Sequence, residues 1–420
     1  MKRKDFCRYF FYLLGGMIAT SFPSLSLALN NSTHKKYLSL SSSITNQNTL
    51  LNANFSTSFL KSYYRWVIVY WMPYDNDLER FGESIIQMLI ESTINNPDVL
   101  VVVQSDYLGD QKMRRRLIFD GKVEEVEVTE ENSSDSVALA NYLDWVKQSC
   151  SAKYFGFIIV GHGGKLNEIS PDYQGPLMRN RTWMGVEQLS EVITYFNKST
   201  DGKVQFLFLQ NCHKATLEVI YQVRNCAKYT LASQFLLGVP NYYYKGFFDA
   251  LKQPSINGRE AAIAIMDSEH SNMYYTLTLV DNQAVKDLPK NLLPFLKIIV
   301  NHSFLAVNMN KLLTYSYRNE KYCDILVFLN YLANISHSGK QQLSNFIHFL
   351  QSSVITYYQT GGSLYKHQGL STQSKQMNQQ SLSGLGLYIP ESKSAISHYR
   401  SFDLYKVIDL MSLYSKMFSL

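Results

Sequence analysis

The chain has 420 residues, of which 46% are hydrophobic and 18% are charged. This composition excludes an intrinsically disordered chain, and the length indicates one large domain with an appended part, or two domains. The formal net charge of +6 is small for this length and argues against a nucleic-acid-binding surface.

The first 28 residues have the pattern of a secretory signal peptide. Four basic residues precede an apolar run at residues 9–22, and Ser26-Leu27-Ala28 provides small residues for cleavage after Ala28. The run is too short to span a bilayer, and no later stretch of the sequence reaches about 18 apolar residues. We therefore expect a secreted or periplasmic protein with no integral membrane segment after signal removal. A retained N-terminal anchor is the alternative.

Residues 29–62 are rich in Ser, Asn and Thr, and we expect them to form a polar linker or pro-segment. Apolar segments typical of buried strands then alternate with amphipathic segments typical of helices, from residue 63 to about residue 255. The expected strands cover residues 66–72, 99–104, 117–120, 123–128, 154–160, 204–210 and 229–232. The first expected helix ends near residue 92, and the others cover residues 136–150, 182–197 and 214–226. This alternation predicts an α/β fold with a mainly parallel sheet between helices.

Residues 256–420 have a mainly helical pattern. We expect this region to complete or brace the core. Its expected helices cover residues 259–269, 292–309, 322–335 and 399–418, with a polar loop at residues 371–383 and a short strand at residues 385–389.

Two of the expected strands end next to residues suited to nucleophilic catalysis. His162 follows the apolar run at residues 154–160, and Cys212 follows the run at residues 204–210. The carboxyl ends of parallel strands meet at one edge of a sheet, so we expect the two side chains to lie close together. A cysteine nucleophile needs a nearby base, because a free thiol is mostly protonated near neutral pH. The pattern therefore predicts a Cys–His pair, although each residue alone is also common in a structural role.

The cysteines give no sign of a metal centre. Cys150, Cys212, Cys226 and Cys323 remain after signal removal, and their spacing does not indicate zinc. With Cys212 as a free nucleophile, at most one disulfide is expected.

Three segments in this order resemble the motifs of the clostripain family of cysteine peptidases, in the caspase-like clan. They are WMPYDNDLERF at residues 71–81, GFIIVGHGG at residues 156–164, and the strand–Cys–helix block at residues 206–233. Weaker similarity continues at TLTLVD and LGLYIP, so the resemblance covers roughly residues 65–415. It implies a caspase- or gingipain-like fold and a cysteine endopeptidase that acts on a peptide or protein substrate.

The resemblance also implies roles for single residues. Cys212 would attack the scissile carbonyl and form an acyl-enzyme, while His162 would protonate the leaving amine and later activate water. The backbone N–H groups of Gly163 and Cys212 would form the oxyanion hole. A helix starting near His213 would lower the pKa of the thiol through its N-terminal dipole.

One position departs from the family pattern. The clostripain motif has an Asp two residues before the Cys, where it lies in the S1 pocket and selects Arg or Lys, whereas this chain has Gln210. An amide lacks the charge that balances a basic side chain, so the P1 preference is open. Asp75, Asp77 and Asp106 follow strand ends on the same rim and could supply an S1 carboxylate. Helix capping is the alternative role for Asp75 and Asp77.

Two further family properties are self-cleavage and calcium activation. The loop at residues 164–182 contains Lys165, Arg179 and Arg181, which are candidate self-cleavage sites. If S1 does not prefer basic side chains, processing is absent or is done by another protease. The sequence has no EF-hand-like loop, so Ca²⁺ is suggested by the resemblance only, with Asp75 and Asp172 as candidate ligands.

Other functions remain open from the sequence. A pseudopeptidase that binds peptides or proteins through an intact fold is the main alternative, motivated by Gln210. An adhesin or scaffold would predict repeats, which the sequence lacks. An acyl-enzyme resolved by an amine would give a transpeptidase.

Overall fold

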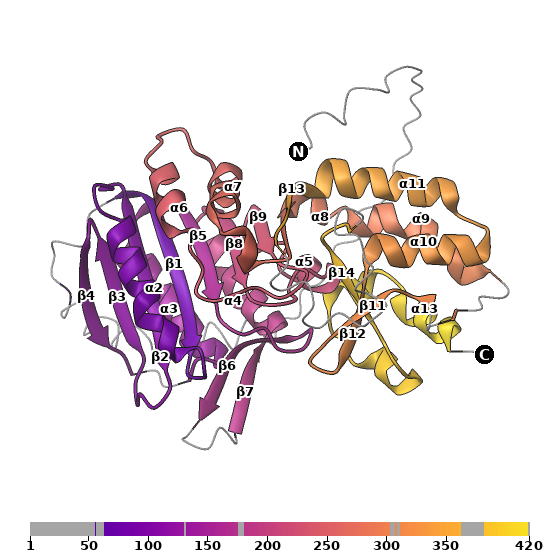
Figure 1. Ribbon diagram of the computed structural model, residues 1–420, viewed down its shortest axis with the longest axis horizontal. Coiled ribbons are helices and arrows are strands. Elements are labelled where there is room, and N and C mark those ends of the chain that lie inside the picture. The colour runs from indigo at the N-terminus through magenta and orange to yellow at the C-terminus, as the bar shows by residue number, and fades with distance from the viewer. Residues whose placement is uncertain are drawn as a thin grey trace. The chain divides into compact units, whose positions relative to one another are not determined.

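The computed structural model describes residue 55 and residues 63–129, 132–174, 180–302, 307–308, 311–362 and 382–418. They belong to one compact unit, Asn48–Leu420 (Figure 1). The expected signal peptide, nearly all of residues 29–62, most of the polar loop at 371–383, and Arg179 lie outside the described residues.

A nine-stranded sheet forms the centre of this unit, in the order β13-β10-β9-β8-β5-β1-β2-β3-β4. Its five inner strands run parallel: β1 (Tyr64–Tyr74), β2 (Val99–Tyr107), β5 (Ala152–Val160), β8 (Val204–Gln210) and β9 (Tyr229–Ala232). The hairpin of β3 (Arg114–Phe119) and β4 (Lys122–Glu127) adds one antiparallel edge. On the other edge are β10 (Thr276–Asp281) and β13 (Ile355–Thr360), so the C-terminal region contributes strands to the sheet. The predicted mainly parallel α/β fold is confirmed.

The inner strands are apolar on both faces because helices cover both. Along β1, alternate residues point to opposite faces, so Val67, Val69 and Trp71 join one apolar core while Trp66, Ile68 and Tyr70 join the other. Helices α2 (Glu79–Ser92), α6 (Tyr244–Leu251) and α7 (Gly258–Ser268) cover the second core. The first core is covered by α3 (Ser136–Ser149), α4 (Val186–Ser199), α5 (Leu217–Gln222), α8 (Asn282–Val285) and α9 (Leu288–Asn301).

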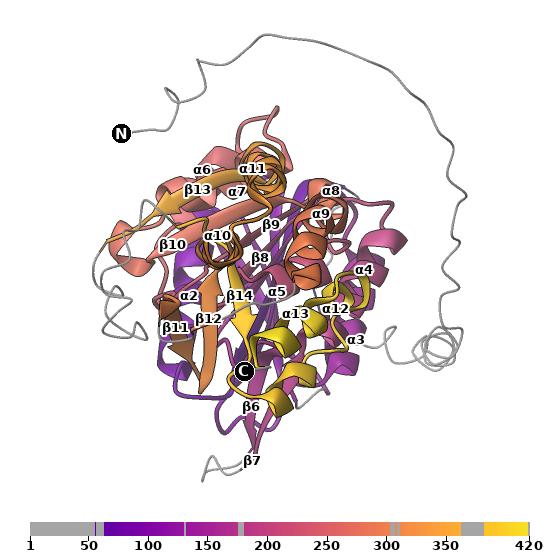
Figure 2. The same ribbon diagram turned by 90° about the vertical axis from the view of Figure 1, so that its right-hand side faces the viewer.

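The last part of the chain builds a second, smaller sheet beside the first (Figure 2). Its strands are β11 (Thr314–Tyr317), β12 (Glu320–Asp324) and β14 (Gly386–Ile389), all antiparallel. Two helices, α10 (Ile325–Ser336) and α11 (Lys340–Phe349), follow β12, and α12 (Asp403–Val407) and α13 (Leu410–Met417) end the described chain. Single turns of tighter or wider helix occur at Ser271–Met273, Leu350–Val354 and Lys393–Ser397.

Several expected helices are shorter than predicted. The predicted helix at residues 322–335 starts as strand β12, and the predicted helix at residues 399–418 is divided into α12 and α13. The segment expected to be a long loop after His162 is largely a two-stranded hairpin of β6 (Glu168–Gln174) and β7 (Asn180–Gly185). Helix α4 consequently begins at Val186 rather than near residue 182.

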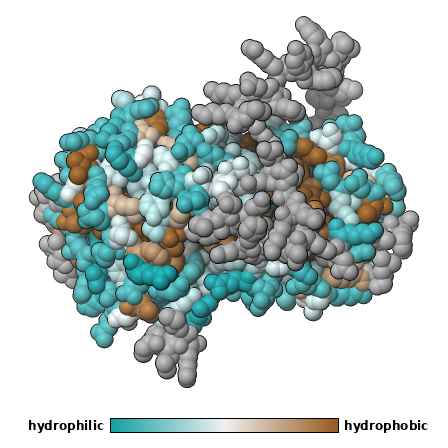
Figure 3. All heavy atoms as spheres, in the orientation of Figure 1, coloured by the Kyte–Doolittle hydropathy of each residue, from teal (hydrophilic) through white to brown (hydrophobic). Residues whose placement is uncertain are grey.

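The surface of the described part is mostly hydrophilic on the face shown in Figure 3. Exposed large apolar side chains are scattered over separate elements, including Ile94, Val137 and Tyr195. Among the residues described, no helix has the length and apolar character that crossing a bilayer requires. The four described cysteines are free thiols.

Candidate active site

Two neighbouring strands bring His162 and Cys212 to the same edge of the sheet. Val160 of β5 is paired with Gln210 of β8, and each catalytic candidate follows its strand by the same two residues. Both side chains line one pocket of ≈ 300 Å³. The expectation that the two would lie close together is met by the parallel pairing of the strands.

Asn211 fixes the two strand ends to each other. Its side-chain amide donates hydrogen bonds to the carbonyl oxygens of Gly161 (2.9 Å) and His162 (3.3 Å). The backbones approach so closely here that a Cβ on Gly163 would collide with the carbonyl oxygen of Cys212. A glycine is therefore required at position 163, next to His162.

The imidazole of His162 has a carboxylate partner. Its Nε2 atom lies 2.9 Å from Oδ1 of Asp77, whose side chain is 60% exposed. Burial opposes ionisation of Asp77, but the hydrogen bond and the charge attraction to His162 outweigh it and lower the pKa of the carboxyl. The sequence suggested that Asp77 lies in the S1 pocket or caps a helix, whereas in the structure its side chain contacts His162.

The thiol of Cys212 lies in a buried environment. The backbone N–H of Leu237 donates to Sγ over 3.4 Å. Burial raises the pKa of the thiol, while the contacts with Leu237 and Tyr317 and the positive charges of Lys214 and Arg318 oppose the rise only in part. The free protein therefore holds Cys212 mainly as the neutral thiol near neutral pH.

The helix expected directly after Cys212 is not there. Residues 213–216 form a turn in which His213 has a φ of 57°, and α5 begins only at Leu217, capped by the side chain of Thr216. A helix of six residues that starts five positions from the sulfur does not lower the pKa of the thiol as the sequence predicted. The predicted dipole effect is wrong, and burial controls the pKa instead.

A hairpin from the second sheet closes one side of the pocket. The Tyr317 ring stacks on His213 with a centroid distance of 4.0 Å, and its hydroxyl donates to the carbonyl oxygen of Gly163. The next residue, Arg318, also lines the pocket. Neither residue carries a local signal of such a role, and each lies more than 100 positions from Cys212, so sequence reasoning missed both.

The inner wall of the pocket is made of neutral polar groups. Gln210 is 4% exposed; its amide accepts a hydrogen bond from the Tyr243 hydroxyl (2.8 Å) and donates one to Asn241. The Tyr243 hydroxyl in turn lies 3.2 Å from that of Tyr70. Gln210 thus lines the pocket of Cys212, and both the oxygen and the nitrogen of its side-chain amide form hydrogen bonds.

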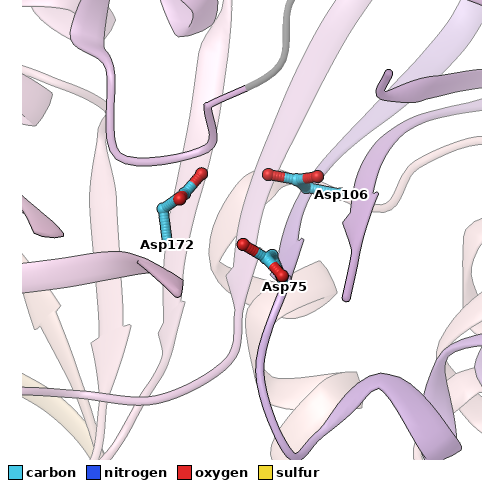
Figure 4. Close-up of side chains that lie close together, drawn as sticks. All are labelled: Asp75, Asp106 and Asp172. Atoms are coloured by element: carbon cyan, nitrogen blue, oxygen red, sulfur yellow. The ribbon is translucent and has the colours of Figure 1, made fainter. Parts of the chain in front are cut away.

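Asp75 and Asp106 do not line this pocket and instead meet Asp172 in a separate cluster (Figure 4). One oxygen from each carboxylate lies within 4.8 Å of the others. The backbone N–H of Tyr173 donates to Asp75, and that of Ser133 donates to both Asp106 and Asp172. The structure therefore places the suggested S1 carboxylates away from the thiol.

Burial and mutual repulsion dominate this acidic cluster. Burial, followed by the charge of Asp172, raises the pKa of Asp75 to about 6 and that of Asp106 to about 8, and burial also raises that of Asp172. The second oxygen of Asp172 is buried and has no hydrogen-bond partner. Three converging oxygen ligands with one unpartnered atom fit a hard divalent cation such as Ca²⁺.

The candidate self-cleavage residues lie in or next to the β6–β7 hairpin. Lys165 is exposed just before β6, and the exposed Arg181 of β7 places its guanidinium 4.0 Å from the ring centroid of Tyr173. Arg179 lies outside the described residues.

Comparison with known proteins identifies the family and the fold. The model of the clostripain family matches residues 70–416. A secreted C11 cysteine protease from Bacteroides thetaiotaomicron, solved with an irreversible peptide inhibitor, has a similar structure, with a TM-score of 0.62 and 17% identity over 83% of this chain and 99% of that chain. An inactive zymogen C11 protease from Parabacteroides distasonis gives a TM-score of 0.61 and 15% identity over 82% and 97% of the two chains. A comparison with curated proteins finds no match.

Proposed function

Because this chain belongs to the clostripain family of cysteine peptidases, we propose that it is a cysteine endopeptidase whose nucleophile is Cys212 and whose acid–base residue is His162. The observation that carries the proposal is their placement: adjacent parallel strands in matched register bring both side chains into one pocket. Acyl transfer requires such a pair of nucleophile and base beside a space that the substrate can enter.

The first chemical step is attack of the Cys212 sulfur on the scissile carbonyl carbon. Since burial keeps the thiol neutral, its proton must leave as substrate binds, and His162 is the base in the pocket that accepts it. The same proton passes to the leaving amine as the peptide bond breaks, which leaves an acyl-enzyme. His162 then removes a proton from water, and hydrolysis releases the new carboxyl terminus and the thiol. Asp77 orients the ring through its contact with Nε2.

The tetrahedral intermediate carries a negative oxygen that needs hydrogen-bond donors. We assign this role to the backbone N–H groups of Gly163 and Cys212, because the absence of a Cβ at Gly163 lets the two backbones converge beside the sulfur. Asp75, Asp106 and Asp172 would hold Ca²⁺, which would supply positive charge to neutralise three buried carboxylates at the ends of their strands. We assign it no step in the reaction.

The protein is proposed to act outside the cytoplasm. The signal-peptide pattern of residues 1–28 supports export, and the similar protease from Bacteroides thetaiotaomicron is described as secreted. Its substrate is therefore a peptide or protein that reaches the cell envelope or the medium.

The dyad is tested with Cys212→Ala and His162→Ala in purified residues 29–420, using a mixed fluorogenic peptide library. We expect each variant to lose more than about 1,000-fold in kcat/KM, while its thermal midpoint stays near that of the wild type. Cys226→Ala is the matched control, since Cys226 is a buried cysteine that does not line the pocket. An electrophilic peptide should label wild type and the control but not Cys212→Ala. Turnover or labelling that persists without Cys212 would refute the assignment, and a folded wild type that is neither labelled nor active would favour the pseudopeptidase.

A further inference from the structure

Apart from His162, the described residues that line the pocket around Cys212 carry formal charge of one sign only, which is positive. Among the described residues that line it, Arg318 is the only one that carries a permanent charge. Gln210 and Asn241 supply neutral amides, and the remaining side chains there are apolar, glycine or tyrosine. A pocket with this lining attracts an anionic substrate group and repels a cationic one.

The backbone holds Arg318 at this position. Arg318 and Asn319 form the two-residue turn between β11 and β12, with φ values of 50° and 62° that are typical of a tight hairpin. The preceding residue, Tyr317, is attached to both strand ends of the site through its contacts with Gly163 and His213. The backbone of Arg318 therefore cannot move away from the pocket without breaking the contacts of Tyr317.

The guanidinium is accessible to a substrate and also interacts with the Tyr317 side chain. Arg318 is exposed, and in the part of the chain that the structure describes it forms no ion pair with a carboxylate. Its ionisable neighbours are Tyr317, Tyr173 and the Cys212 thiol. An arginine at a pocket mouth with unused donors is suited to a bidentate contact with a carboxylate.

Two nearby carboxylates do not reverse this charge. Asp77 is paired with His162. Glu269 is buried behind Asn241, and its oxygens accept hydrogen bonds from the backbone N–H groups of Tyr242 and His270. Neither residue lines the pocket, and none of the described residues that line it is a carboxylate that would balance a basic P1 side chain.

We propose that the enzyme cleaves after Asp or Glu, and that Arg318 is the specificity residue that binds the P1 carboxylate, in a pocket that the neutral side chain of Gln210 also lines. The inference rests on the proposed cysteine-peptidase function. The proposed P1 side chain is acidic, whereas an Asp at position 210 would select a basic one, Arg or Lys. The inference also predicts no self-cleavage after Lys165, Arg179 or Arg181.

The test uses fluorogenic peptides that differ only at P1, with Asp, Glu, Asn, Gln, Arg or Lys. Asn and Gln match the acids in shape and lack only the charge. For wild type we expect kcat/KM for Asp or Glu to exceed that for Asn or Gln at least about 10-fold, with Arg and Lys lowest. Arg318→Gln should remove the preference for acids over amides, and Arg318→Glu should move cleavage toward Arg and Lys. Lys321→Gln, which removes the same charge from the same hairpin outside the pocket, should keep the wild-type order.

Each other outcome is decisive. Wild-type cleavage that is fastest after Arg or Lys, or equal after acids and amides, would overturn the acidic preference while leaving the dyad intact. So would an unchanged order in Arg318→Gln, or Cys212-dependent fragments that end at Lys165, Arg179 or Arg181. A folded wild type that cleaves none of the peptides and resists a small thiol-reactive label at Cys212 would overturn the proposed function itself.

Discussion

The side chain of Asp77 makes a contact that its local sequence does not predict. Its position just before α2 is typical of a helix cap, yet its side chain contacts the His162 ring 85 positions away. A carboxylate on an imidazole fixes the orientation of the ring and stabilises the protonated form that arises during acyl transfer. In the proposed mechanism Asp77 is therefore a positioning residue for His162.

We predict that Asp77→Asn lowers kcat about 10-fold with little change in KM, because the base loses its charged partner while the substrate contacts remain. Steady-state kinetics on the preferred peptide measure the split between kcat and KM. Asp98→Asn is the matched control, since Asp98 is equally exposed and pairs with a basic residue, Arg65, outside the site. A loss confined to KM, or an equal loss in the control, would contradict the positioning role.

At the scale of elements, the β11–β12 hairpin is the part of the second sheet that completes the site. Tyr317 gives it two contacts there, a ring stacked on His213 and a hydroxyl on Gly163. The hairpin thus supports the turn that carries Cys212 and the backbone that carries the proposed oxyanion donor.

We predict that Tyr317→Ala lowers kcat/KM at least about 10-fold, since both contacts are lost, and that Tyr317→Phe, which keeps the ring, loses less. The measurement is kcat/KM beside the thermal midpoint, so that loss of activity is separated from unfolding. Tyr195→Ala on α4 serves as the control because Tyr195 is 47% exposed and far from the pocket lining. Equal activity of wild type and Tyr317→Ala would show that the hairpin does not support the site.

The sequence predicted the inner strands well because their signal is local. In the predicted strand at residues 204–210, residues 206–209 are all apolar, which is typical of a strand buried on both faces, and β8 covers the predicted residues. The sequence did not predict how short α5 and α12 are. Helix α12 is held at Asp403 by Arg224, 179 positions away.

The candidate site was predictable only as far as strand ends determine it. His162, Gly163, Gln210 and Cys212 follow from β5 and β8, whereas Arg318 approaches from a different sheet. The proposed S1 role of Asp75 and Asp106 has no support in the geometry, because β6 brings Asp172 to them on another side of the sheet edge. Contacts between residues so far apart in the chain produce no periodic pattern in a single sequence.

For the molecule as a whole, the acidic cluster links stability to pH. The pKa values of Asp75, at about 6, and Asp106, at about 8, lie above the ordinary value near 4, so these carboxyls bind protons on folding. Their contribution to the free energy of unfolding is full below about pH 4 and is lost as the pH rises through about 6 and then 8. A bound cation would replace the protons above that range.

We predict that Asp172→Asn, which removes the charge that repels both neighbours, flattens this dependence. Between pH 5 and pH 8 the thermal midpoint of the wild type should fall about 2–4 °C further than that of the variant. Millimolar Ca²⁺ at pH 8 should raise the wild-type midpoint and have a smaller effect on Asp172→Asn. Thermal scans with Ca²⁺ or a chelator measure both effects, with Asp98→Asn as control. Parallel pH curves and no calcium shift would show that the cluster neither binds protons on folding nor holds the ion.

The matched register of β5 and β8 has a consequence for how the protein can diverge. The proposed nucleophile and base, Cys212 and His162, follow two inner strands of a nine-stranded sheet. Among the described residues that line their pocket, the only permanently charged one lies in a two-residue turn of a separate, smaller sheet. A single codon change in that turn leaves every strand of the large sheet untouched. If the proposed roles of Cys212 and Arg318 hold, descendants of one gene can change the proteins they cut while they keep the same chemistry. We then expect inhibitors that react with the Cys212 sulfur to cross-react more widely than inhibitors that bind the turn.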